Sequence, residues 1–324
     1  MARILVTGAA GFLGRHLTAA LAARGDRVTA LDLDPLDAAE GVVPVIGDVT
    51  DAGALKRHAE GHDAILHAAA IADLWAPGDI HDRVNRGGTE AAVAAAEGAG
   101  AKLVYVSSYT TLVAVGTKPG ARLDERVAQP PEALLGPYPA AKRRGEIAVE
   151  AAAARGLHAL SVLPSAPIGA GDLRPTPPGR MTLDLARGAT PALIDTVLDL
   201  VDVAALTTGI LAALDRGIPG RRYLLTGEQL SLADFAGKVA ALTGTPAPRA
   251  RVPLAVALAA ARVEAGLAAL TGRAPTAPLT GVRLAARPVS FDTTLAEQEL
   301  GWAPPPIDAA LAAAIQDFRD RGLL

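Results

Sequence analysis

Arg3-Ile4-Leu5-Val6-Thr7-Gly8-Ala9-Ala10-Gly11-Phe12-Leu13-Gly14 is the stretch of sequence that decides the fold of this chain. A short apolar run passes directly into three glycines, and a helical pattern from Phe12 to Ala23 follows. A dinucleotide pyrophosphate needs a tight turn, a backbone without an obstructing Cβ, and a helix N-terminus whose N–H groups face the anion. Gly8, Gly11 and Gly14 meet these needs, so the stretch predicts a dinucleotide-binding turn between a strand and a helix. An ordinary glycine-rich turn is the weaker alternative, because a matching acid follows downstream.

That acid is Asp32, at the end of a predicted strand over Val28–Asp32. A carboxylate there can accept hydrogen bonds from both hydroxyls of the adenosine ribose, and it would repel a 2′-phosphate. No arginine follows in Asp32-Leu33-Asp34-Pro35, so the sequence predicts NAD(H) rather than NADP(H) as the cofactor. The alternative is that Asp32 only caps a turn. At the start of the helix, Phe12 and Leu13 are expected to border the same cofactor.

Short β-branched runs alternate with alanine-rich helical runs through the N-terminal half, a pattern typical of βαβ units that form a parallel sheet. The predicted strands are Arg3–Thr7, Val28–Asp32, Val43–Ile46, Ala64–His67, Leu103–Val106 and Ala159–Leu163. The predicted helices are Phe12–Ala23, Ala52–Glu60, His81–Glu97 and Tyr138–Arg155. The fold class is therefore α/β, with a Rossmann-like, doubly wound parallel sheet.

A second, smaller and mostly helical lobe is predicted to hold the substrate. The segment Pro167–Gly179 is rich in proline and glycine, which places the lobe boundary there. We predict an NAD-binding lobe over residues 1–170, to which residues 194–225 return. Residues 171–193 and 226–324 then form the substrate lobe, with helices at Leu232–Leu242 and Leu254–Thr271.

Composition restricts the partners. The chain has 324 residues, a formal net charge of −3 and no cysteine, which excludes disulfides and thiolate chemistry. Its dispersed lysines and arginines give no electrostatic footprint for nucleic acid or for an anionic membrane surface, so a small-molecule substrate is expected. The apolar run Ile4–Val6 begins too early for a secretion signal, which predicts a cytoplasmic protein. Arg262 and Glu264 interrupt the most apolar later stretch, so no transmembrane span is expected.

Tyr138-Pro139-Ala140-Ala141-Lys142 places a phenol and an ammonium on one face of a predicted helix. A free tyrosine titrates near pH ~10, and a neighbouring ammonium favours the phenolate. We therefore expect Lys142 to lower the pKa of Tyr138 and to reach the nicotinamide ribose. A Tyr and a Lys at this spacing also occur by chance, so the pair is informative only together with other predicted active-site residues.

One such residue is Ser108, which follows the predicted strand Leu103–Val106. It lies at the carboxyl edge of the sheet, where such sheets bind ligands. Its hydroxyl could bind a substrate carbonyl. The alternative is that Ser107 and Ser108 only satisfy backbone groups where the strand ends. Tyr109 and Thr110 are reserve candidates for the same role.

The chain resembles the extended short-chain dehydrogenase/reductases, which include nucleotide-sugar epimerases, dihydroflavonol reductases and 3β-hydroxysteroid dehydrogenases. Beyond the glycine turn, the matching pieces are Gly47-Asp48-Val49, His67-Ala68-Ala69-Ala70, Val84-Asn85-Arg86-Gly87-Gly88-Thr89 and Leu300-Gly301-Trp302-x-Pro304. The resemblance implies that Tyr138 is the general acid/base, Lys142 its activator and Ser108 the carbonyl-positioning group. It also implies a set of residues around the cofactor, namely Asp48 at the adenine, Val49, Ala68, Ala69 and Ala70, Asn85 near a proton relay, Tyr138, Lys142, Pro164 and Ser165. No metal is implied, and a homodimer is the family expectation.

The stretch Val162–Asp172 looks closest to the hopanoid-associated epimerase-like subgroup. Two departures weaken a nucleotide-sugar substrate, namely Leu163, where many sugar-nucleotide members have arginine, and Ala204-Ala205, where members often have acids. Because aromatic residues make up only 3% of the chain, the sequence favours an apolar or lipid-like ketone such as a 3-oxo-ceramide. An NAD-dependent nucleotide-sugar epimerase/dehydratase is the alternative, and a non-catalytic dinucleotide-binding protein is the second. The alternative for the aliphatic residues of Val252–Leu270 is that they pack in the hydrophobic core and do not contact the substrate.

Overall fold

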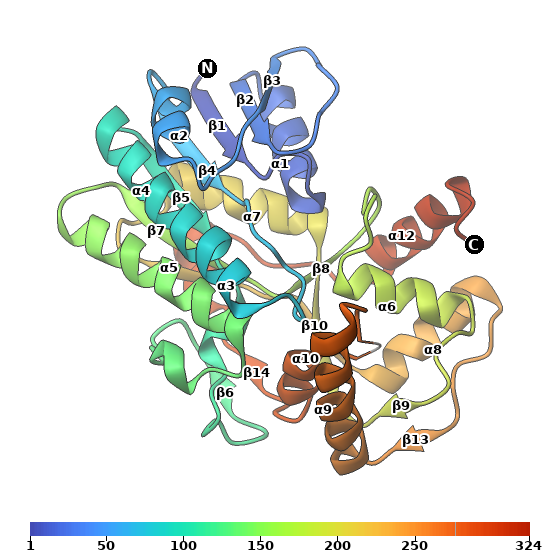
Figure 1. Ribbon diagram of the computed structural model, residues 1–324. Coiled ribbons are helices and arrows are strands. Elements are labelled where there is room, and N and C mark those ends of the chain that lie inside the picture. The colour runs from blue at the N-terminus through green and yellow to red at the C-terminus, as the bar shows by residue number, and fades with distance from the viewer. Residues whose placement is uncertain (276) are drawn as a thin grey trace.

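A seven-stranded parallel sheet forms the centre of the protein in the computed structural model, which describes residues 1–275 and 277–324 (Figure 1). The strands lie in the order β11-β7-β5-β4-β1-β2-β3, and all six pairings are parallel. Their bounds are β1 Arg3–Thr7, β2 Arg27–Asp32, β3 Val42–Ile46, β4 Ala64–His67, β5 Lys102–Val106, β7 Ala159–Pro164 and β11 Arg222–Leu225. Parallel strands require crossover helices, so both faces of the sheet are covered.

Each face of the sheet has its own layer of helices and its own hydrophobic core. One layer is formed by α1 (Phe12–Ala23), α7 (Val203–Arg216) and α11 (Thr294–Leu300). The other is formed by α2 (Ala52–Ala59), α4 (Gly88–Ala99) and α5 (Pro137–Ala154), which lie side by side in Figure 1. Buried alanines on α4 and α5 pack against the strand residues of this core.

A second cluster of elements packs around a separate core. Helices α6 (Pro177–Ala186), α8 (Leu232–Thr243) and α12 (Asp308–Asp320) surround a three-stranded sheet of β8 (Ala166–Ile168), β10 (Val197–Asp202) and β12 (Glu228–Ser231). Helices α9 (Leu254–Thr271) and α10 (Leu279–Ala285) pack against each other beside it. Two small sheets complete the structure, β9 (Leu193–Ile194) with β13 (Arg251–Val252), and β6 (Arg122–Leu123) with β14 (Ser290–Phe291).

The six predicted strands and the α/β fold class are confirmed, with strand ends within one residue of the prediction. The helix predicted over His81–Glu97 lies within an unbroken helical stretch of α3 (Gly78–His81), a π-helical segment (Asp82–Gly87) and α4, and the π-helical segment was not predicted. A π-helical segment keeps helical hydrogen bonding while it shifts the face that each side chain takes. The lobe boundaries stay a prediction. Within the described residues, none of the helices combines the length and apolarity that crossing a bilayer needs.

Candidate active site

The carboxyl ends of β1, β4, β5 and β7 meet at one edge of the sheet, and the predicted site residues follow these ends. Strand β1 lies between β2 and β4, so the direction of chain progression reverses beside it. Open α/β sheets bind ligands in the crevice outside such a switch point. Topology alone therefore brings the glycine turn, the Ala68–Ala70 stretch and Ser108 to one place.

In the glycine turn, the backbone at Gly8 lies close to the backbone at Ala68 and Ala69. Gly8 has a φ of +71°, and a Cβ there would lie 2.6 Å from the backbone of Ala69. A Cβ on Gly14 would lie 2.0 Å from the Gly8 carbonyl oxygen. Helix α1 then begins at Phe12, and its N-cap Gly11 supplies no side-chain hydrogen bond to the first turn. The first N–H groups of α1 have no side-chain cap, and the space beside the turn would be filled by any Cβ. Both features suit a bound pyrophosphate, so these residues fit NAD(H).

Asp32 is tied to the same turn. Its Oδ2 accepts a hydrogen bond of 2.8 Å from the Ala10 amide, and its Oδ1 accepts one of 3.1 Å from the Asp34 amide. The carboxylate therefore holds a turn and also stands beside the glycine loop. Asp34 forms an ion pair with Arg174. The sequence analysis considered only the residues directly after Asp32 and therefore did not identify this distant arginine.

The remaining predicted cofactor residues lie along the same edge. The stretch Ala68–Ala70 follows β4 and is partly exposed beside the glycine turn. Asp48 is exposed two residues beyond β3, whereas Val49 is buried. Pro164 ends β7, and Ser165 after it is buried.

Asn85 is buried in the π-helical segment and fixes the loop that leaves β4. Its Oδ1 accepts a 2.8 Å hydrogen bond from the Ile71 amide, and its Nδ2 donates one of 2.9 Å to the Ile71 carbonyl. The same Nδ2 lies 3.1 Å from Nδ1 of His81, whose ring makes an edge contact with Tyr138 at 5.7 Å. Asn85 therefore reaches Tyr138 through His81, a neighbour that the sequence did not single out.

Ser108, Tyr138 and Lys142 come together at the ends of β5 and α5. Ser108 Oγ accepts a 3.0 Å hydrogen bond from the Thr110 hydroxyl, and Ser108 lies near enough to Tyr138 to lower its pKa. Lys142 Nζ donates a 2.8 Å hydrogen bond to the Val106 carbonyl, two residues before Ser108. The structure thus assembles the three residues that the sequence picked out from two distant segments.

The expected effect of Lys142 on Tyr138 is wrong. Burial raises the pKa of Tyr138, and the hydrogen bond with Ser108 lowers it only in part. The ammonium group of Lys142 is directed to the Val106 carbonyl, and burial lowers the pKa of Lys142 to about 7, with Glu146 opposing the shift. Desolvation disfavours the charged form of each side chain, and at this site that cost exceeds the attraction expected from sequence spacing.

This lowered pKa predicts a pH dependence of stability. The pKa of Lys142 is about 7 in the folded chain, against ~10.4 for a free lysine, so the unfolded chain binds more protons between these values. Stability from Lys142 therefore rises as the pH increases from 7 towards 10. We expect the urea midpoint of the wild type to rise more between pH 7 and pH 9 than that of Lys142→Met. Equal rises in the two proteins would contradict the assignment.

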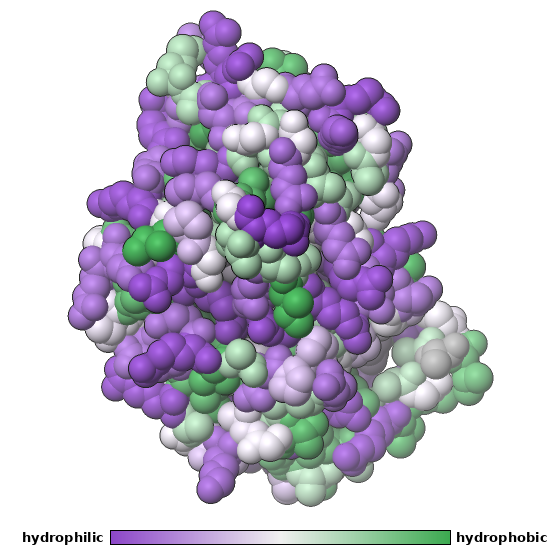
Figure 2. Space-filling model, turned by 90° about the vertical axis from the view of Figure 1, so that its left-hand side faces the viewer, coloured by the Kyte–Doolittle hydropathy of each residue, from purple (hydrophilic) through white to green (hydrophobic). Residues whose placement is uncertain are grey.

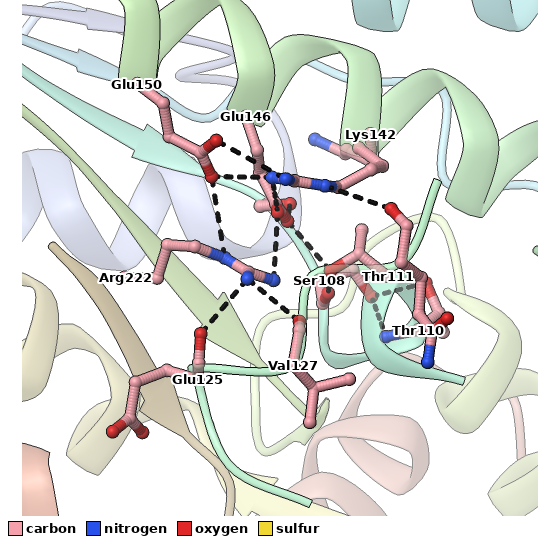
Figure 3. A network of polar contacts seen from close by, with 12 residues as sticks. Ser108, Thr110, Thr111, Glu125, Val127, Lys142, Glu146, Glu150 and Arg222 are labelled. Carbon is pink, nitrogen blue, oxygen red and sulfur yellow. Dashed lines mark hydrogen bonds and ion pairs between the residues drawn. The ribbon is translucent and has the colours of Figure 1, made fainter. Parts of the chain in front are cut away.

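A buried ionic network lies directly behind Lys142, on the next turn of α5 (Figure 3). Glu146 is fully buried, and its Oε1 accepts hydrogen bonds from Ser107 and, at 2.8 Å, from Thr111. Its Oε2 lies 3.0 Å from a guanidinium nitrogen of Arg143 and 3.1 Å from one of Arg222. The carboxylate therefore joins α5 to the end of β5 and to β11.

Arg222 continues the network towards the loop after β6. It donates two hydrogen bonds of 3.0 Å, to the carbonyls of Glu125 and Val127 (Figure 3). The sequence analysis missed this network. The one available signal is that Glu146 stands four residues after Lys142, on the same helix face.

Comparison with known proteins places this geometry in a family. Residues 4–225 match the model described as the NAD dependent epimerase/dehydratase family. The chain is 36% identical to a putative dihydroflavonol 4-reductase of Synechocystis sp., over 98% of this chain and 94% of that protein. It is 33% identical to sterol demethylase protein B of Methylococcus capsulatus, over 99% of both chains. It is also 33% identical to a 4-hydroxy-2-methyl-3-oxo-4-farnesyl-3,4-dihydroquinoline-1-oxide ketoreductase of Stigmatella aurantiaca, over 93% of this chain and 92% of that protein.

Among solved structures, the crystal structure of gox2253 superposes on the whole chain with a TM-score of 0.85 at 31% sequence identity, and it is itself fully covered. The family model covers the strands from β1 to β11 that carry the glycine turn and the Ser108, Tyr138 and Lys142 cluster. The chain therefore belongs to the NAD-dependent epimerase/dehydratase family, whose extended short-chain dehydrogenase/reductase fold it shares.

Proposed function

We propose that this enzyme interconverts a ketone and a secondary alcohol with NAD(H), and that Ser108, Tyr138 and Lys142 carry the reaction. The observation that supports this most is that the hydroxyls of Ser108 and Tyr138 lie together at the carboxyl edge of the sheet, beside Lys142. A carbonyl oxygen that takes the place between these two hydroxyls meets two donors at once.

In the direction of reduction, Ser108 would hold the carbonyl oxygen while Tyr138 donates its hydroxyl proton to that oxygen. Gly8, Gly11 and Gly14 would hold NADH, which would supply the hydride for the carbonyl carbon and be oxidised to NAD⁺. The Tyr138 phenolate then regains a proton from solvent. Because burial raises the pKa of Tyr138, the phenol stays protonated at neutral pH and is suited to the role of acid. Lys142 would position the nicotinamide ribose.

The substrate that we favour is apolar or lipid-like, such as a 3-oxo-ceramide. Helices α6 and α9 border a cavity of about 240 Å³ whose lining includes Met181, Leu185, Leu193 and Val282. The printed name of the Stigmatella relative describes a ketoreductase for a farnesyl-bearing 3-oxo compound, and that of the Methylococcus relative refers to a sterol. Both names fit a site that excludes water from a large hydrophobic ketone.

Nucleotide-sugar epimerisation or dehydration remains the second candidate, since the family description names both reactions. Leu163 and Ala204-Ala205 depart from the residues that sugar-nucleotide members often carry, which favours the ketoreductase. A non-catalytic dinucleotide-binding role is the third candidate. A cytoplasmic location, a homodimer and the two-lobe division stay predictions of the sequence.

A screen of NADH consumption tests the substrate class. Purified enzyme is offered 3-oxo-ceramides, 3-oxosteroids and 2-alkyl-3-oxoalkanoates in one set, and UDP- and dTDP-linked 4-keto sugars in another. We expect turnover only in the first set. Turnover confined to nucleotide sugars would overturn the proposed substrate.

Asp32 should control the choice of cofactor. A hydrogen bond to a charged partner contributes about 1.5–3 kcal/mol, so Asp32→Ala should raise the KM for NADH by about ten-fold or more. The ratio of NADPH to NADH efficiency should rise in the same variant, because the charge that repels a 2′-phosphate is gone. Steady-state kinetics with both cofactors measure this, with the exposed neighbour Asp37→Ala as control. An unchanged ratio would remove Asp32 from cofactor selection.

A further inference from the structure

Helix α9 presents an apolar stripe to solvent. Its large hydrophobic residues Val256, Val263, Leu267 and Leu270 are 56%, 65%, 54% and 85% exposed. Their spacings of seven, four and three residues place all four within about 60° around the helix, since each residue turns it by 100°. Single exposed apolar residues are common, whereas a continuous stripe on one helix face marks an interaction surface.

The same segment is locally cationic. Residues 249–273 contain four arginines, Arg249, Arg251, Arg262 and Arg273, against the single acid Glu264. This local excess contrasts with the net charge of −3 for the whole chain. The excess is confined to the segment around α9 and does not extend over the whole chain. Arg251 lies 3.6 Å from Asp195, and the arginines that remain in excess complement an anionic surface.

Helix α9 is linked to the candidate active site through α10. Helix α9 packs on α10, and the Thr280 side chain of α10 packs so closely on Gly136 that a Cβ at Gly136 would lie 2.3 Å from its hydroxyl oxygen. Gly136 is two residues before Tyr138. The neighbouring face of α9, which carries Ala257, Ala260, Ala261 and Glu264, borders the apolar cavity. Figure 2 shows hydrophobic atoms gathered on a protrusion at the right, at the height where α9 meets α10 in Figure 1.

We propose that the stripe on α9 docks the enzyme onto the surface of a membrane that contains anionic phospholipid. The four apolar side chains enter the region between headgroups and acyl chains, while Arg262 and Arg273 contact phosphate groups. An interfacial helix with an apolar face and flanking cations binds in this way without crossing the bilayer. This docking does not depend on the proposed reaction, but it would place the active site where a lipid-like ketone resides.

Vesicle co-sedimentation of the full chain tests the proposal. We expect binding to vesicles of 70% phosphatidylcholine and 30% phosphatidylglycerol, and at least ten-fold weaker binding to pure phosphatidylcholine. The triple variant Val263→Ser, Leu267→Ser and Leu270→Ser should lose binding at least ten-fold. The control variant Val115→Ser and Ile218→Ser, at residues 62% and 44% exposed elsewhere, should bind like the wild type. Arg262→Ala with Arg273→Ala should weaken binding to anionic vesicles only.

Failure of docking and failure of the proposed function give different results. Docking predicts that the triple variant keeps wild-type NADH oxidation on a dispersed short-chain ketone, because it changes none of Ser108, Tyr138 and Lys142. Absence of wild-type binding to anionic vesicles would overturn the proposal. Equal loss of vesicle binding in the control variant would also overturn it. So would a wild-type dimer in analytical sedimentation that is absent in the triple variant, because a second copy would then occupy the stripe.

Discussion

Tyr138→Phe should lower kcat by about 10²–10⁴-fold on any ketone that the wild-type enzyme reduces. The substitution removes one hydroxyl and keeps the ring that contacts His81, so folding should not change. Without that hydroxyl, the carbonyl oxygen has no proton donor as hydride arrives. Affinity for NADH should stay within a few-fold of the wild type, because the glycine turn is untouched. Single-turnover kinetics and NADH fluorescence titration measure the two quantities.

Tyr109→Phe is the matched control for this experiment. Tyr109 follows Ser108 directly, and its ring makes an edge contact with Phe291 at 5.3 Å. Burial raises the pKa of Tyr109 far above that of a free tyrosine, so it remains a phenol throughout the working range. We expect Tyr109→Phe to keep most of the wild-type rate. Equal turnover by Tyr138→Phe and the wild type would remove Tyr138 from the mechanism.

Glu146→Ala should destabilise the fold by about 3–5 kcal/mol, the usual cost of removing one partner from a buried ion pair. The change leaves the guanidinium groups of Arg143 and Arg222 facing each other without the carboxylate between them. It also removes the acceptor of the Ser107 and Thr111 hydroxyls. Urea unfolding followed by circular dichroism measures the loss.

Two further variants separate charge from position. Glu150→Ala removes a carboxylate of the same network whose side chain is 33% exposed, and it should cost at most about 1 kcal/mol. Glu146→Gln keeps an acceptor for the two hydroxyls but no charge for the arginines, so its stability should fall between those of Glu146→Ala and the wild type. Equal losses for Glu146→Ala and Glu150→Ala would show that the network does not depend on the buried carboxylate.

The sequence predicted the fold well because its signals are local. The glycine turn can form only where a strand passes into a helix, and Gly8 lies against Ala69 with no room for a Cβ. Periodicity then located the strands of the sheet, since each is a short apolar run between helices. The same reasoning placed Ser108 and Tyr138 together, because Ser108 follows the end of a strand and Tyr138 lies at the start of a helix.

Other features depend on long-range contacts, which sequence spacing does not contain. Arg222 reaches Glu146 from β11, and Arg174 reaches Asp34 across the chain. The pKa of Tyr138 rises because burial dominates over any charge on Lys142, and the extent of burial becomes known only once the chain has folded. The apolar stripe on α9 fits a predicted helix, but only packing shows which of its faces is left exposed.

Transfer of deuterium from 4-deuterated NADH tests the central claim most directly. The enzyme is given this cofactor with a keto-lipid substrate, and the product is analysed by mass spectrometry alongside the NAD⁺ formed. The proposed reaction predicts one deuterium on the carbinol carbon and one NAD⁺ for each alcohol. A product without deuterium, formed while the NADH concentration stays constant, would contradict it.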